Sequence, residues 1–157
     1  MTAVRDLAVR WGERELAYGE VFDAFADHCA AELDDVEVVE RRDDLLVARW
    51  RRETSRLELR DGFDGVERMA TDGPTMLLGD VGDDDARLVE AFLDDAELRE
   101  RVVVCDLDRL ERIGAVRSSV FAYLEWFLRD EYGVKLLPSP HFTQGLIERG
   151  IIHLGMG

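Results

Sequence analysis

The apolar residues change their spacing at residues 61–73, and this change limits the possible folds more than any other feature of the chain. Before this Gly- and Asp-rich segment, short alternating runs predict strands, and one stretch of helical period predicts a helix. The expected order is a hairpin, a helix and three strands, over residues 7–18, 19–33, 36–41, 45–51 and 55–60. The first half is therefore expected to fold as ββα-βββ.

After residues 61–73, strand-like and helix-like stretches alternate. The expected strands cover residues 75–78, 102–105, 134–137 and 151–154, and the expected helices cover residues 84–98, 115–132 and 139–150. The resulting order βαβαβαβ, added to the first half, predicts an α+β or α/β fold with a mixed β-sheet. At this length we expect a single domain, 1–157, in which 61–73 could join two subdomains.

The charge balance is strongly acidic. The chain has 35 acidic and 20 basic residues, which gives a net charge of -15 at pH 7, and Lys135 is its only lysine. Many acids and few lysines are typical of proteins from salt-accumulating cells, where dissolved salt screens the self-repulsion of a negative surface. We therefore expect a halophilic protein. The same charge disfavours nucleic acid as a partner, because its phosphates would be repelled.

Composition also bears on the class and location of the protein. Apolar residues make up 46% of the chain, which is enough for a core and excludes wholesale disorder. No apolar run approaches the roughly 18 residues of a membrane span, and the N-terminus lacks the apolar core of a signal peptide. Two cysteines, Cys29 and Cys105, are too few for a disulfide scaffold. We expect a cytoplasmic protein that does not bind a membrane.

Acidic residues follow two predicted strands, at the positions where parallel βαβ sheets bind ligands. Asp80 follows the first strand of the second half, and Asp106 and Asp108 follow the next. His141 comes shortly after the third strand and could be a neutral acid/base partner in the same cleft. Such carboxylates can hold Mg²⁺ and leave room for substrate phosphates. One hypothesis is therefore a Mg²⁺-dependent phosphoryl-transfer or hydrolytic enzyme, with Asp80, Asp106 and Asp108 as ligands and Asp106, Asp108 and His141 as catalytic residues.

The run from Val102 to Asp108, Val-Val-Val-Cys-Asp-Leu-Asp, resembles the first motif of haloacid-dehalogenase-like phosphatases. By that resemblance, Asp106 would be the nucleophile and Asp108 the acid/base residue. The sequence departs from the family pattern at Leu110, where Thr or Val is usual, and no paired carboxylates follow Lys135 to complete a metal site. The resemblance is confined to this motif and assigns no family. The alternative interpretation is that these acids are solvated caps of the following helices.

Arginines are concentrated in residues 41–60, which carry a positive net charge although the rest of the chain is acidic. An arginine-rich surface with a nearby aromatic ring could bind an anion or an RNA strand through bidentate and stacked contacts. The residues proposed for this are Arg49, Trp50, Arg51, Arg56 and Arg60. The alternative is that these arginines form ion pairs with acids across the strands.

Two features indicate association with a second copy of the chain. Trp126 falls outside the main apolar stripe of the helix predicted over 115–132. The run 151–156 is apolar and could be an internal strand, which we favour, or an edge strand that pairs with another copy. The favoured hypothesis is a non-catalytic binding or assembly domain that could be a homodimer, with no cofactor expected. The Mg²⁺ enzyme and the anion- or RNA-binding module are the alternatives.

Overall fold

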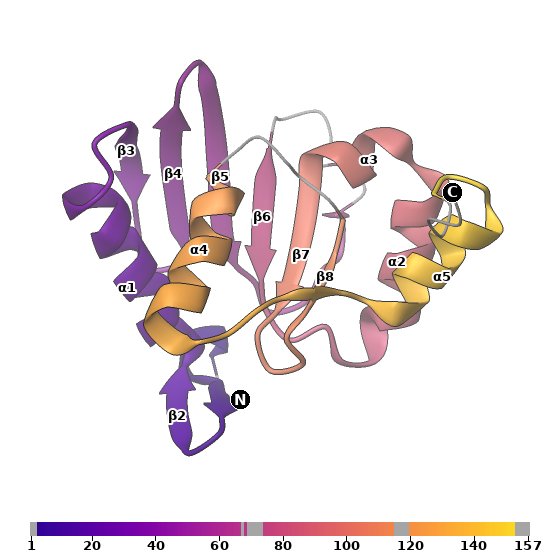
Figure 1. The fold of residues 1–157 in the computed structure, drawn as a ribbon, viewed down its shortest axis with the longest axis horizontal. Helices are drawn as coiled ribbons and strands as arrows, with labels where there is room; N and C mark the ends of the chain where they lie inside the picture. The colour runs from indigo at the N-terminus through magenta and orange to yellow at the C-terminus, as the bar shows by residue number, and fades with distance from the viewer. Residues whose placement is uncertain (1–2, 67, 69–73, 115–119, 153–157) are drawn as a thin grey trace.

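The computed structural model describes residues 3–66, 68, 74–114 and 120–152 of the chain. Its central element is a seven-stranded mixed sheet, which confirms the predicted α+β fold (Figure 1). In their order across the sheet, the strands are β3 (Val36–Arg41), β4 (Leu45–Trp50), β5 (Glu53–Leu59), β6 (Thr75–Leu78), β7 (Val102–Asp106), β8 (Glu111–Ile113) and β9 (Leu137–Pro138).

A separate hairpin and five α-helices complete the described part of the fold. The hairpin pairs β1 (Ala8–Trp11) with β2 (Arg14–Ala17). The helices are α1 (Tyr18–Ala31), α2 (Asp85–Asp94), α3 (Ala96–Arg101), α4 (Phe121–Tyr132) and α5 (Pro140–Glu148). Short 3-10 turns cover Val4–Asp6 and Gly82–Asp84. In the described part of the chain, no helix has the length and apolar content that a membrane span needs.

The strand directions divide the sheet into two parts. β3, β4 and β5 form the predicted antiparallel meander, and β5, β6 and β7 run parallel, so the carboxyl ends of these last three meet at one edge. β8 then runs antiparallel to β7, and β9 runs parallel to β8. The second half therefore departs from the predicted order βαβαβαβ after β7, because β8 follows β7 without a helix between them. The parallel strands, at whose ends a ligand site was expected, end at β7. Leu110, at a left-handed φ of 58°, lies in the turn that returns the chain at this point.

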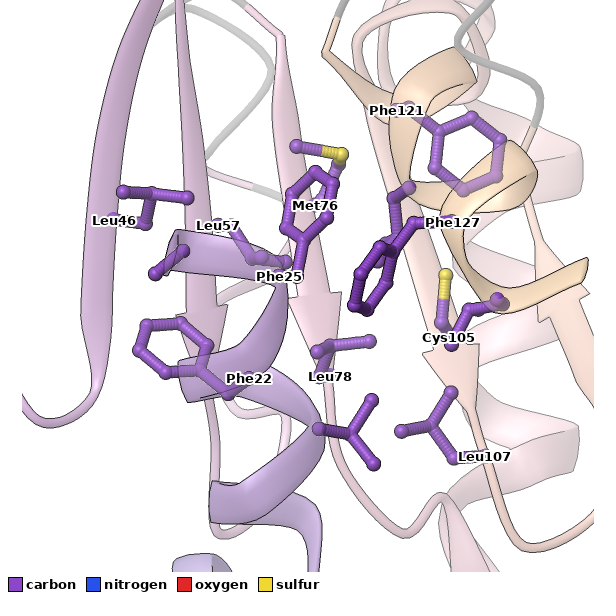
Figure 2. Packing of buried hydrophobic residues seen from close by; sticks show 14 of the residues in the cluster. Phe22, Phe25, Leu46, Leu57, Met76, Leu78, Cys105, Leu107, Phe121 and Phe127 are labelled. Carbon is purple, nitrogen blue, oxygen red and sulfur yellow. The ribbon is translucent and has the colours of Figure 1, made fainter. Parts of the chain in front are cut away.

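Helices cover both faces of the sheet with separate apolar cores. On one face, Phe22 and Phe25 of α1 and Phe127 of α4 pack toward sheet residues that include Leu57 and Met76 (Figure 2). On the other face, side chains of α2, α3 and α5 pack on β6, β7 and β8. β7 is buried from both sides, as its continuous apolar run predicted. Cys29 and Cys105 are both fully buried in the first core.

The N-terminal hairpin is fixed to the main body by aromatic contacts. The Trp11 indole N–H donates to the carbonyl of Leu107 at 3.0 Å, and its ring centroid lies 5.2 Å from that of Tyr132. The Arg14 guanidinium stands 4.9 Å from the Tyr132 ring centroid. The hairpin therefore bridges the end of α4 and the loop that follows β7.

Several predicted boundaries are wrong, each for a local reason. The helix expected over 84–98 is two helices, because Asp95 accepts a hydrogen bond from the Leu98 N–H and begins α3. Tyr18 begins α1 instead of ending the hairpin. The strand expected over 151–154 is absent from its described part: Ile151 and Ile152 lie in a bend, and both N–H groups donate to the Leu146 carbonyl. The later residues of that run lie outside the described residues.

Candidate functional site

Asp106 is the last residue of β7 and lies at the edge where the parallel strands end. Its side chain is only 1% exposed. Oδ1 accepts a hydrogen bond from the Arg109 N–H at 2.9 Å, and Oδ2 accepts one from the Val81 N–H at 3.1 Å. The Arg109 guanidinium adds a charge contact, with Nε 3.7 Å from Oδ2. Both carboxylate oxygens are therefore engaged by the loops that follow β6 and β7.

The Tyr18 hydroxyl completes this buried cluster. It accepts hydrogen bonds from the N–H groups of Leu107 and Asp108, at 3.2 and 3.3 Å. Its own proton can go to the Gly79 carbonyl at 3.3 Å or to Asp106 Oδ1 at 3.4 Å. Tyr18 thus connects the start of α1 to the carboxyl ends of β6 and β7. We call Tyr18 and Asp106 with these backbone groups the Tyr18–Asp106 cluster.

Burial governs the proton affinity of both side chains. It raises the pKa of the Asp106 carboxyl above the ordinary 3.8, while the N–H groups of Arg109 and Val81 act in the opposite direction. Burial also raises the pKa of the Tyr18 hydroxyl, and the negative charge of Asp106 raises it further. Tyr18 therefore remains a neutral hydrogen-bonding group at neutral pH.

The other two predicted metal ligands lie at the same edge but are exposed. Asp80 Oδ1 accepts a hydrogen bond from the Gly82 N–H at 3.0 Å, and its charge contributes to the raised pKa of Asp106. Asp108 enters the cluster through its backbone N–H. Among the described His, Cys, Asp and Glu residues, no three are grouped so that they could hold one ion. Magnesium binding by these residues therefore stays a prediction.

The cavity beside Asp106 is small. It measures about 10 Å³, roughly the space of a single water molecule, and is lined by residues that include Val81, Arg109 and Glu111. His141 is exposed on the first turn of α5 and lines a different, open groove of about 580 Å³ between α2 and α5. The structure therefore does not bring His141 and Asp106 into one cavity. Arg109 lines both spaces.

The arginines of the meander are engaged with neighbouring acids. Arg49 lies 3.5 Å from Glu37 on the adjacent strand. Glu58 lies between two arginines, 2.9 Å from Arg56 and 3.9 Å from Arg60. These distances correspond to the ion-pairing alternative weighed for this segment. Surface ion pairs of this kind contribute little each, but they offset the positive charge that an anion would need.

Trp50 does not share a face with the arginine that precedes it. Consecutive residues of a strand point to opposite sides, so Trp50 and Arg49 are separated by the sheet. The Trp50 indole N–H donates to Asp35 at 3.0 Å, and the Arg51 guanidinium stands 4.4 Å from the Trp50 ring centroid. The five residues proposed for anion binding therefore do not form one continuous surface.

Asp35 joins Trp50 to α4, a contact that no sequence pattern indicated. Its carboxylate also accepts a hydrogen bond from the Tyr123 hydroxyl, and these two donors lower the pKa of Asp35 below 3.8. The Trp50 and Tyr123 rings meet edge to face, with centroids 6.2 Å apart. The three residues are far apart in the chain, so neither period nor spacing could reveal the contact.

Trp126 lies on the opposite side of α4 from the core. Its side chain is 67% exposed, the highest value of any large hydrophobic residue in the described part of the chain. Its neighbour Phe127 is 6% exposed and packs against Phe25, with ring centroids 5.6 Å apart. The fold therefore buries one of two consecutive aromatic residues and leaves the other in solvent.

Comparison of the chain with protein-family models, with curated proteins and with solved structures gives no match.

Proposed function

We propose that this chain is a non-catalytic assembly domain that binds a protein surface through the outer side of α4. The exposed Trp126 carries the proposal. Large aromatic side chains at the surface are enriched where proteins bind one another, since they supply contact area with little loss of conformational entropy. The acidic composition supports a site of action in the cytoplasm of a salt-accumulating cell.

The internal use of the strand-end groups supports a non-catalytic role. Asp106 already accepts two backbone hydrogen bonds, and the cavity beside it has room for about one water molecule. A nucleophile or metal ligand at this position would need free oxygens and room for a substrate. The meander arginines also have acidic neighbours, which favours a structural role for them.

Photo-crosslinking in the cells that make the protein tests the proposal. A benzophenone-bearing amino acid replaces Asp130, which is exposed one turn after Trp126, and in a matched control it replaces exposed Glu97 of α3. We expect a protein adduct from position 130 and none from position 97. The absence of any adduct from position 130, in cells where the chain is folded and abundant, would overturn the proposal.

A further inference from the structure

We propose that the surface bound by α4 is the same surface of a second copy, in an antiparallel pair of α4 helices. This inference rests on the proposed function and specifies the partner. Four exposed positions carry it: Ala122, Trp126, Arg129 and Gly133. We call them the α4 outer stripe.

The spacing of the α4 outer stripe is that of a helix-pairing seam. Its members follow one another at intervals of four, three and four residues, as the a and d positions of a coiled coil do. On a helix this spacing keeps Ala122, Trp126 and Arg129 within an arc of about 60°. Gly133 follows as the left-handed residue that ends α4. The opposite side of α4 is buried in the core, through Phe121, Leu124, Phe127 and Leu128. One side of α4 thus packs on the sheet, and the other presents a complete seam to solvent.

The seam is complementary to itself under a two-fold axis. An antiparallel pair centred between residues 127 and 128 places each Trp126 opposite Arg129 of the partner subunit. A guanidinium over an indole face is a favourable pair, and the symmetry produces it twice. Ala122 then faces Gly133 of the partner subunit, so small residues at both ends allow the two backbones to approach. No Cβ carbon would meet an atom within 4 Å at Gly133, where α4 ends.

The charges on this side of α4 are largely offset within each copy. Each copy carries a net charge of -15, so two copies repel unless they meet where acid is scarce. Arg129 and Asp130 balance one another on this side of α4, and Glu125 lies 3.7 Å from Arg112. Arg129 makes no ion pair within the part of the chain that the structure describes, although the chain has 35 acids for 20 bases. Its guanidinium is therefore available to the indole of a second copy.

The size of the interface and the salt concentration determine the expected affinity of the α4 pair. A helix the length of α4 spans about 18 Å. A pair of such short helices should bury less than the roughly 1,200 Å² of total area found in stable complexes, so we expect a dissociation constant in the micromolar range or weaker. Salt should tighten the pair, because the Debye length falls from about 10 Å at 0.1 M to about 3 Å at 1 M and screens the repulsion between copies.

Analytical ultracentrifugation of the full chain tests the pair in about 0.1 M and about 1 M KCl. We expect a monomer–dimer equilibrium that strengthens with salt. Trp126→Ala and Arg129→Gln should each weaken it roughly tenfold or more, because each removes both symmetric contacts. Arg101→Gln, at an exposed arginine of α3, is the matched control and should leave the equilibrium unchanged. A monomer at millimolar concentration in high salt, or a dimer that survives Trp126→Ala, would overturn the inference.

A spin label tests the direction of the helices. Lys135→Cys places the label just beyond α4, and labelling is specific because Cys29 and Cys105 are buried. Mixed with an isotopically labelled copy, it should broaden amide signals most strongly near Val120 of the other chain. Broadening centred on residue 135 would contradict the antiparallel pair. In the photo-crosslinking experiment, an adduct of twice the chain mass supports the inference. An adduct with a different protein alone overturns it and leaves the proposed function standing.

Discussion

The Tyr18–Asp106 cluster buries polar side chains, whereas the α4 outer stripe exposes a large aromatic side chain. In the cluster, Tyr18 and Asp106 are each 1% exposed, and hydrogen bonds engage their side-chain oxygens. In the stripe, a tryptophan is 67% exposed beside an arginine that has no ion pair with any described residue. Charged groups are rarely buried, and Trp126 leaves most of a large amphipathic ring in water.

The two sites differ in whether contacts within the chain account for the position of their side chains. Buried polar groups persist when every hydrogen-bonding group has a partner, and the cluster satisfies that condition within the chain. Contacts within the chain are therefore sufficient to stabilise it. The exposed Trp126 contributes nothing to the core that Phe127 next to it already fills. A partner outside the monomer is the explanation we propose for it.

The largest expected effect is at Asp106. Asp106→Ala leaves the buried N–H group of Val81 and the partly buried N–H group of Arg109 without acceptors, and should lower the free energy of unfolding by about 3 kcal/mol. Asp108→Ala, at an exposed side chain, should change it by less than about 0.5 kcal/mol. Urea unfolding at fixed salt measures both. Equal costs for the two variants would remove the structural explanation of the cluster.

Tyr18→Phe should have the next largest effect. It removes the hydroxyl that accepts from two backbone N–H groups and keeps the shape of the ring, so we expect a loss of about 1–2 kcal/mol. Tyr132→Phe is the matched control. Its ring also packs in the first core, but none of the described hydrogen bonds uses its hydroxyl. A loss no larger than that of the control would show that the hydroxyl is dispensable.

The folded-state pKa of Asp106 should lie above the ordinary value of 3.8, and that of Asp35 should lie below it. Burial raises the pKa of Asp106, so the part of the stability that depends on its bound proton is full below 3.8 and is lost as the pH rises through its folded-state pKa. Hydrogen bonds from Tyr123 and Trp50 lower the pKa of Asp35, so its contribution is full above that value and is lost as the pH falls through its folded-state pKa. Carboxyl carbon NMR shifts measure both midpoints. The reverse order would contradict the burial of Asp106.

The smallest expected effect is at Trp126. Trp126→Ala should change the free energy of unfolding of the dilute monomer by less than about 0.5 kcal/mol, because the side chain packs on no core. Phe127→Ala, one residue later, should cost about 3–5 kcal/mol by emptying a core position. A large cost at Trp126 would mean that the ring stabilises the monomer, and its position would then need no partner to explain it.

Much of the fold can be predicted from the spacing of apolar residues along the sequence. The alternation in β5 and the helical period of α1 come from burial on one side, which is a local property of the chain. The exposed position of Trp126 could be predicted in the same way, from its angle to the apolar stripe of α4. Predictions failed where a capping group decided the outcome, as Asp95 does by beginning α3.

The site was less predictable than the fold. The position of Asp106 after an apolar strand was evident, but its partner Tyr18 lies 88 residues earlier and was assigned to a strand. Strand geometry predicts that Arg49 and Trp50 lie on opposite faces of the sheet. It does not predict the contact of Asp35 with Trp50 and Tyr123. Contacts between distant segments depend on how the elements pack together. The spacing of residues in a single sequence does not reveal them.

The long separation within the Tyr18–Asp106 cluster has a consequence for synthesis of the chain. Tyr18 emerges from the ribosome before the residues that bind its hydroxyl, which come about 90 positions later. At 5–20 residues per second, this interval is roughly 5–18 s. During it, α1 lacks the anchor at its first residue, so the N-terminal helix can dock fully only after β7 has been made.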